Sequence, residues 1–284
     1  MKYDLVDRRC VVTGANTGIG KEIARNLAYF GATVVLACRD RERGSAALHE
    51  LVQDSGNERL TMLQLDVSSR ASIRAFVRNL TAGGSPVHVL VNNAAVVCPT
   101  RETTVDGVER TWATNVLGYF TLTNLLLPTL RRSAPARVVH VASTSAGGLD
   151  LRDVQFQTRA WDAMAAYRQS KQADRMLAWQ LAEICRRDGI GVHACHPGAV
   201  DTGLLRGSDA TWLQRLLGAG RRIGLKTPAE GAVTPTYVAA APEVTETTGR
   251  FWIDGATAPC KFTANPDELA ALWRVCVELT DCDA

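Results

Sequence analysis

The chain has 284 residues, of which 46% are hydrophobic and 21% are charged. This composition is typical of a water-soluble globular protein with enough apolar material for a sizeable core. The formal net charge of +3 is too small to indicate binding to nucleic acid or to an anionic membrane. No run of 18 apolar residues occurs in the sequence, so we expect no membrane span, no signal peptide and a cytoplasmic location.

Eight cysteines are scattered along the chain without the CxxC spacing of many zinc sites. In a chain of this size without a secretion signal, we expect reduced thiols, most of them buried. His193, Cys195 and His196 are the nearest approach to a metal-binding cluster. Because neighbours on a strand point to opposite faces and no fourth ligand is evident, we expect no metal.

Short apolar runs alternate with helical patterns from the N-terminus onward. The sequence predicts strands at residues 9–12, 33–37, 60–65, 87–91, 137–142 and 190–195. Helices are predicted between them, around residues 19–28, 40–55, 73–80, 105–130 and 162–188. This alternation predicts an α/β fold, a Rossmann-like doubly wound parallel sheet with helices on both faces. Without a linker or an internal repeat, we expect a single domain over residues 1–284.

One segment breaks the alternation. Residues 203–227 combine glycines, bulky apolar side chains and arginines after the sixth predicted strand. Ligands bind beyond the carboxyl ends of the strands in open α/β sheets, so an insertion here predicts a substrate lid. A plain surface excursion is the alternative.

A glycine-rich turn joins the first predicted strand to the first predicted helix. Residues 13–20 read Thr-Gly-Ala-Asn-Thr-Gly-Ile-Gly, which places glycine at 14, 18 and 20. Glycines here allow a tight turn and a close approach of the backbone to a pyrophosphate at the helix N-terminus. A flexible turn would have the same composition, but the position in the first βαβ unit favours a dinucleotide site.

The end of the second predicted strand bears on the choice of cofactor. An NAD site places an acidic residue there to bind the ribose 2′-hydroxyl. This strand ends without an acid, and its first polar side chain is Arg39. A guanidinium suits a 2′-phosphate, so we expect NADP(H), with NAD(H) as the less favoured cofactor. Alternatively, Arg39 and Asp40 only cap the next helix.

Tyr167 and Lys171 lie four residues apart in a predicted helix and therefore share one face. A free phenol titrates near ~10, and an ammonium within a few ångströms lowers the pKa of such a group toward neutral. The pair therefore predicts a general acid. A surface tyrosine and lysine on an amphipathic helix is the alternative.

The motifs together resemble the short-chain dehydrogenase/reductase family, in its classical subgroup and closest to the retinol-dehydrogenase-like branch. The resemblance rests on TGANTGIG, ACRD, LDVSS, VNNAA, Asn115, the region of Ser143, YRQSK and HPGAVDT, which follow one another along most of the chain. It implies that Tyr167 is the acid/base and that Lys171 assists Tyr167 and binds the nicotinamide ribose. It also implies that Ser143 holds the substrate oxygen and that Asn115 supports a proton-relaying water. Ser145 is the alternative to Ser143.

The resemblance also implies a set of cofactor contacts. Asp66 would bind the adenine, Asn92 would lie against the adenosine ribose, and Pro197 and Gly198 would border the nicotinamide. The full set is Gly14, Asn16, Thr17, Gly18, Ile19, Gly20, Arg39, Asp66, Val67, Asn92, Ala94, Tyr167, Lys171, Pro197, Gly198, Val200 and Thr202. One departure from the family pattern is Ala95, where a glycine is usual.

These features predict an NADP(H)-dependent oxidoreductase that interconverts an alcohol and a ketone or aldehyde by hydride transfer. Leu204, Leu205 and Trp212 in the expected lid, with Ser143 and Tyr167, favour a fairly apolar small-molecule substrate. The alternatives are a catalytically idle NADP-binding regulator and an isomerase or lyase on the same fold.

The resemblance further implies a homodimer or homotetramer. In this family the long helices, here around residues 105–130 and 162–188, often pack across a two-fold axis. Leu117 and Trp179 are candidate contacts, although either residue could equally face the sheet.

Overall fold

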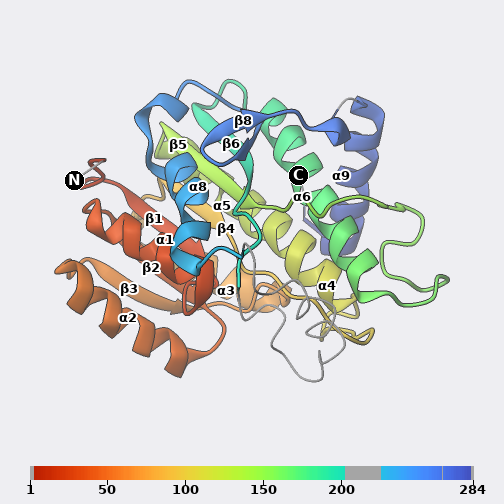
Figure 1. Cartoon of the computed structure of the whole chain (residues 1–284), viewed down its shortest axis with the longest axis horizontal. Helices are drawn as coiled ribbons and strands as arrows, with labels where there is room; N and C mark the ends of the chain where they lie inside the picture. The colour runs from red at the N-terminus through yellow and green to blue at the C-terminus, as the bar shows by residue number, and fades with distance from the viewer. Residues whose placement is uncertain (1–2, 202–224, 264, 283–284) are drawn as a thin grey trace.

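The computed structural model describes residues 3–201, 225–263 and 265–282. Within these residues, eight strands pair side by side in the order β3-β2-β1-β4-β5-β6-β7-β8, as Figure 1 shows. Neighbours from β3 through β7 run parallel, and β8 is antiparallel to β7. The strands are β1 (Arg9–Thr13), β2 (Thr33–Cys38), β3 (Leu60–Gln64), β4 (Val89–Asn92), β5 (Ala136–Val141), β6 (Ile190–His196), β7 (Arg250–Ile253) and β8 (Ala256–Ala258).

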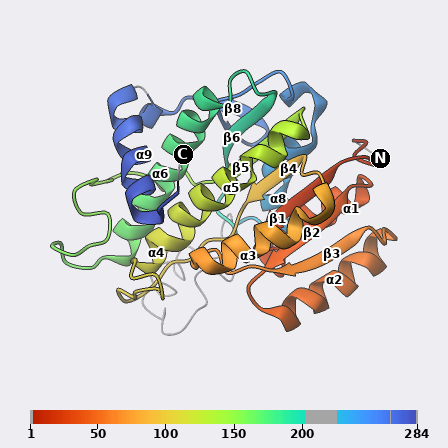
Figure 2. The same ribbon diagram turned by 180° about the vertical axis from the view of Figure 1, so that it is seen from behind.

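Helices cover both faces of the sheet. They are α1 (Gly18–Tyr29), α2 (Arg41–Ser55), α3 (Arg70–Leu80), α4 (Arg110–Trp112), α5 (Gly118–Arg132), α6 (Ala163–Ile184), α8 (Pro228–Ala240) and α9 (Pro266–Thr280). Helices α1, α2 and α8 lie on one face, and α3, α5 and α6 lie on the other, as the two opposite views show (Figures 1 and 2). On β1, Val12 packs into the first core and Val11 into the second, because successive side chains alternate between the faces. The predicted doubly wound α/β sheet is therefore confirmed. Its central strands are continuous apolar runs because both of their faces are buried.

The order of the strands reverses between the neighbours β1 and β4. From β1 the chain adds β2 and β3 on one side, and from β4 it adds the later strands on the other side. Such a reversal leaves a crevice at the carboxyl ends of the strands, where open α/β sheets bind their ligands. The segments that follow β1, β2, β4, β5 and β6 all leave the sheet at this edge. The predicted functional residues lie in or beside these segments.

The helix predicted around residues 105–130 begins later, at Arg110. Thr103 and Glu109 pair as an isolated antiparallel bridge around a tight turn. The Glu109 carboxylate then accepts hydrogen bonds from the backbone N–H groups of Thr111 and Trp112, at 2.6 and 2.7 Å. This side-chain cap satisfies the first donors of the helix and sets its start.

Helix α9 packs against α6, and both views show the two helices side by side (Figures 1 and 2). Trp273 on α9 meets Phe120 on α5 edge to face, with ring centroids 4.8 Å apart. Leu117 is buried in the same cluster. Helix α9 thus covers part of α6, and the homodimer or homotetramer stays a prediction. None of the described helices combines the length and hydropathy that a membrane crossing requires.

Candidate cofactor and active site

The glycine turn brings α1 close to the ends of β1 and β4. Gly14 has a backbone φ of +67°, which residues other than glycine rarely adopt. A Cβ on Gly20 would lie 2.4 Å from Asn93 Nδ2 and 2.5 Å from the Gly14 carbonyl oxygen. Only glycine at position 20 therefore lets α1 begin so close to the turn.

The N-terminus of α1 has no side-chain cap. Thr17 occupies the cap position, but its side chain accepts no hydrogen bond from the helix, and the first turn contains no acidic residue. By contrast, Asp40, Ser69 and Asp162 cap α2, α3 and α6 through their side chains. The first N–H groups of α1, which include that of Ile19 and follow Asn16 in the turn, are thus free to bind an anion. The helix dipole favours an anion at this end. This turn fits the pyrophosphate of a dinucleotide.

The segment after β4 is locked to the end of β1 by Thr13. The Thr13 hydroxyl accepts hydrogen bonds from the backbone N–H groups of Asn93 at 2.9 Å and Ala94 at 3.0 Å. The Asn93 amide in turn donates to the Thr13 carbonyl at 2.9 Å. Asn92 is fully buried, and its amide donates to Thr123 on α5 at 2.9 Å. Asn93, which we did not single out in the sequence, therefore faces the glycine turn, whereas the amide nitrogen of Asn92 is engaged by Thr123.

Arg39 and Asp66 follow the carboxyl ends of the neighbouring strands β2 and β3. Arg39 is exposed, and its guanidinium has no partner among the described residues. Asp40 is the residue that caps α2, accepting from the Arg43 N–H at 2.9 Å. Oδ1 of Asp66 accepts two hydrogen bonds from Ser68, whereas its Oδ2 has no partner within the described part of the chain.

Tyr167 and Lys171 lie one turn apart on α6, and Tyr167 is partly exposed while Lys171 is buried. The Lys171 ammonium lies 5.9 Å from the centre of the Tyr167 ring. It donates to Val141 O at 3.0 Å and to Asp174 Oδ2 at 2.8 Å. Lys171 thus joins α6 to the carboxyl end of β5, the strand that leads to Ser143.

Asn115 lies in a π-helical turn, Ala113–Leu117, between α4 and α5. Such turns are frequent at functional sites. Asn115 Oδ1 accepts from the Val96 N–H at 2.8 Å, and its Nδ2 donates to Ser170 Oγ at 3.0 Å. Ser170 Oγ then donates to the Tyr167 carbonyl at 2.7 Å. Asn115 therefore links the segment after β4 to the turn of α6 that carries Tyr167.

Ser143 follows β5 and differs from Ser145 in its surroundings. Ser143 is 8% exposed, its hydroxyl accepts from the Ser145 N–H at 3.0 Å, and its carbonyl accepts from Arg175 on α6. The Arg175 guanidinium also stacks on the Phe251 ring, 3.8 Å from the ring centre. Ser145 is exposed. Ser143 is thus the serine that is held against α6.

We expect Ser143→Ala to lower kcat by about 10²-fold, because a donor aimed at a developing oxyanion contributes about that much. Ser145→Ala is the matched control, since it keeps the backbone N–H that donates to Ser143. Steady-state kinetics with a saturating nicotinamide cofactor measures both. Loss of activity in Ser145→Ala alone would reverse the assignment.

The chain beyond β6 returns to itself at the edge of the site. Pro197 and Gly198 follow the strand, and Val200 then forms a parallel bridge with Lys226. The Lys226 N–H donates to Ala199 O at 2.8 Å. This bridge joins the chain that precedes the expected lid to the last residues of the lid. Thr202, Leu204, Leu205, Trp212 and all of the lid up to residue 224 lie outside the described residues.

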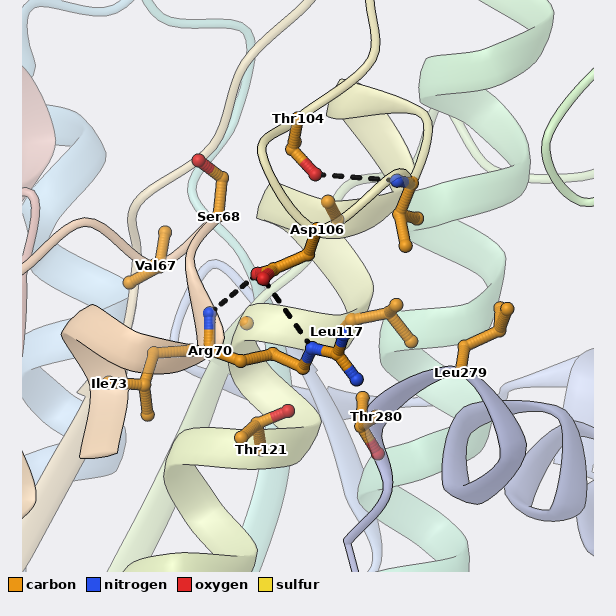
Figure 3. Close-up of a pocket in the computed structure, with 13 residues that line it drawn as sticks. Val67, Ser68, Arg70, Ile73, Thr104, Asp106, Leu117, Thr121, Leu279 and Thr280 are labelled. Carbon is orange, nitrogen blue, oxygen red and sulfur yellow. Dashed lines mark hydrogen bonds and ion pairs between the residues drawn. The ribbon is translucent and has the colours of Figure 1, made fainter.

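A separate shallow pocket, open to solvent, lies between α3, α5 and the end of α9 (Figure 3). Arg70 crosses it to Asp106, which accepts the Arg70 backbone N–H at 2.7 Å. Leu117 and Thr280 also line it. Ser143, Tyr167 and Lys171 are absent from the lining, so we assign this pocket no part in the chemistry. No cluster of histidine, cysteine and acidic residues suited to a metal is found in the described ranges.

An uncapped helix N-terminus at the switch point, together with a buried lysine and a tyrosine at the same edge of the sheet, is typical of a dinucleotide-dependent dehydrogenase or reductase. The family model for short chain dehydrogenases matches residues 8–211, and the chain belongs to this family.

The chain is 42% identical to polyprenol dehydrogenase of Mus musculus, over 96% of this chain and 84% of that protein. It is 36% identical to retinol dehydrogenase 13 of Homo sapiens, over 100% of this chain and 87% of that protein. A solved structure, the Pseudomonas aeruginosa RhlG/NADP active-site complex, is 27% identical with a TM-score of 0.71, covering 89% of this chain and 97% of that one. The protein is therefore an oxidoreductase of the retinol-dehydrogenase-like branch, and its cofactor is a nicotinamide dinucleotide.

Proposed function

We propose that this protein is an NADP(H)-dependent oxidoreductase that interconverts an alcohol and its aldehyde or ketone on an apolar substrate. The observation that carries the proposal is the convergence on α6. Lys171 reaches the end of β5, Arg175 holds the Ser143 carbonyl, and Asn115 binds Ser170 beside Tyr167. The four residues proposed for catalysis, Asn115, Ser143, Tyr167 and Lys171, are thus all connected through α6.

The residues around the glycine turn suit the cofactor. The free N–H groups of α1 would bind the pyrophosphate, the open carboxylate oxygen of Asp66 the adenine, and Arg39 the 2′-phosphate of NADP(H). Lys171 would bind the nicotinamide ribose. When bound, the nicotinamide supplies or accepts the hydride. Arg39 is exposed and has no protein partner in the described ranges, which supports NADP(H) over NAD(H).

The protein groups handle the proton and the substrate oxygen. The Tyr167 hydroxyl donates a proton to the oxygen of a carbonyl substrate, or removes one from an alcohol. The Ser143 hydroxyl holds the same oxygen in place. The Lys171 ammonium, fixed by Val141 O, stabilises negative charge on Tyr167, because opposite charges attract strongly where water is excluded. Asn115 keeps the α6 turn and the segment after β4 in register and, as in the family, supports the relay of protons.

The relatives favour a long apolar substrate. Retinol and polyprenols, which the names of two relatives mention, are isoprenoid alcohols with extended hydrocarbon chains. The proposed substrate contacts Leu204, Leu205 and Trp212 share that apolar character. We therefore propose an apolar allylic alcohol or its aldehyde as the substrate class.

A carbonyl panel tests the proposal. The purified protein is incubated with NADPH and retinal, farnesal, an aryl ketone or a phosphorylated sugar, and oxidation is followed by nicotinamide absorbance. We expect turnover with the apolar aldehydes and none with the phosphorylated sugar. Tight NADPH binding without turnover of any carbonyl, or of retinol and farnesol with NADP, would contradict the proposal and favour the idle regulator.

A further inference from the structure

Asp174 is a buried acid for which neither the motifs nor the proposed mechanism has a use. It lies on α6 three residues after Lys171, and the two side chains form an ion pair at 2.8 Å. The exposed fractions of these side chains are 2% for Lys171 and 0% for Asp174. In the other ion pairs of the described residues, at least one partner reaches solvent. A fully buried pair is costly to form, so this pair calls for an explanation.

The geometry of the ammonium group gives Asp174 an orienting role. A lysine ammonium carries three N–H donors. One donates to Asp174 Oδ2 and a second to Val141 O at 3.0 Å. The third has no acceptor among the described residues, and two fixed acceptors restrict its direction. Lys171 is thus held with one donor left for a ligand.

Charge gives Asp174 a second role. Burial by itself lowers the pKa of a lysine, because it disfavours the ammonium. The Asp174 carboxylate reverses this effect, and the pKa of Lys171 is held above its ordinary value. Burial raises the pKa of Asp174, and Lys171 and Arg175 oppose that rise. Without the carboxylate, the largest remaining influence on the pKa of Lys171 would be its desolvation, which lowers it.

We propose that Asp174 is a positioning residue that keeps the catalytic lysine charged and oriented for the cofactor. This inference rests on the proposed function, since it takes Lys171 as the group that binds the nicotinamide ribose. Asp174 therefore acts through Lys171 and touches neither the substrate nor the cofactor.

The remaining ionisable groups around Lys171 do not obscure a test in alkaline solution. Tyr119 on α5 and Cys195 on β6 have their pKa raised by burial, and His140 on β5 has its pKa lowered to about 4. None of these three changes charge between about pH 7.5 and pH 9.5. Arg175, which faces Asp174, stays protonated there, and the phenol of Tyr167 can be removed by substitution.

The experiment measures NADPH binding by fluorescence titration from about pH 7.5 to pH 9.5, where the 2′-phosphate is fully ionised. Tyr167→Phe is compared with Tyr167→Phe/Asp174→Asn. Asparagine keeps a hydrogen-bond acceptor and removes the charge. We expect a Kd about tenfold higher in the double variant at the lower pH. The Kd of the double variant should rise further, by about tenfold per pH unit, at the pH values where Lys171 loses its proton. The Kd of Tyr167→Phe should change little over the same range. Equal Kd values with the same pH dependence would overturn the inference.

Asp188→Asn is the matched control, because Asp188 accepts from Arg131 at 2.8 Å in an ion pair that reaches solvent. We expect its NADPH affinity to equal that of the parent. If the parent bound neither NADPH nor NADH, the proposed function would fail. Normal binding by the parent with no effect of Asp174→Asn would overturn the positioning role alone.

Thermal melting keeps the inference testable if the Asp174→Asn proteins fold poorly. In the parent, Asp174→Asn should lower Tm, because Lys171 becomes an unpaired buried cation. In a Lys171→Met background the same change should raise Tm, because it removes a buried acid that has lost its lysine partner. A fall of similar size in both backgrounds would show that Asp174 serves the fold independently of Lys171, and would overturn the proposal.

Discussion

Tyr167→Phe is expected to lower kcat by at least about 10²-fold, while NADPH still binds. General acid/base catalysis contributes typically 10²–10⁴-fold, and phenylalanine keeps the ring while removing the proposed proton donor. The ring packing should survive, because the side chain is partly exposed and its neighbour Ser170 binds the backbone carbonyl of Tyr167 and not its hydroxyl. Steady-state kinetics on the best aldehyde of the panel, with NADPH binding measured in parallel, checks the result.

Tyr29→Phe is the matched control. The Tyr29 hydroxyl donates to the Asp54 carbonyl at 2.9 Å on the surface formed by α1 and α2, away from α6. Its kcat should remain near that of the parent. Turnover by Tyr167→Phe close to the parent value would show that another group is the acid, and would leave the fold assignment intact.

Arg39→Ala is expected to weaken NADPH binding by roughly ten- to a hundredfold and to change NADH binding little. A charge-assisted hydrogen bond contributes about 1.5–3 kcal/mol, and only NADPH carries the 2′-phosphate. The side chain is exposed and has no partner in the described part of the chain, so the substitution removes no contact from the fold. The ratio of kcat/KM for the two cofactors, measured in parent and variant, reports the effect.

Arg74→Ala serves as the control, because Arg74 is an exposed arginine on α3. This substitution removes the same charge as Arg39→Ala. Both cofactors should retain their parent kcat/KM in that variant. Equal kcat/KM for NADPH and NADH in the parent would contradict the proposed preference at once.

The last part of the fold was harder to predict than the first. The strands up to β6 are apolar runs bounded by helical patterns, and burial on both faces of a parallel sheet produces that signal. β7 and β8 span four and three residues, too few for a period to show. Helix α9 does carry local signals, with Asn265 capping a helix that begins at Pro266.

Within the site, local periodicity and tertiary contact played different parts. The motif Asn92-Asn93 offers two identical side chains, and only the packing of α5 decides that Asn92 points inward to Thr123 while Asn93 faces the glycine turn. In the same way, Ser143 and Ser145 are alternatives in the sequence. The contact from Arg175, contributed by a different helix, sets the surroundings of Ser143 apart from those of Ser145, and the choice of Ser143 as the catalytic serine stays a prediction.

The sequence by itself determined that Tyr167 and Lys171 share a helix face, because residues four apart are neighbours in any α-helix. It also determined that a glycine turn precedes α1. Only the tertiary structure decided that Lys171 is buried and paired with Asp174, because burial depends on how α5, β5 and β6 pack around α6. A charge three residues away looks the same in sequence whether it lies in water or in the core. Its effect on the lysine depends on the surrounding dielectric, which is a property of the folded chain.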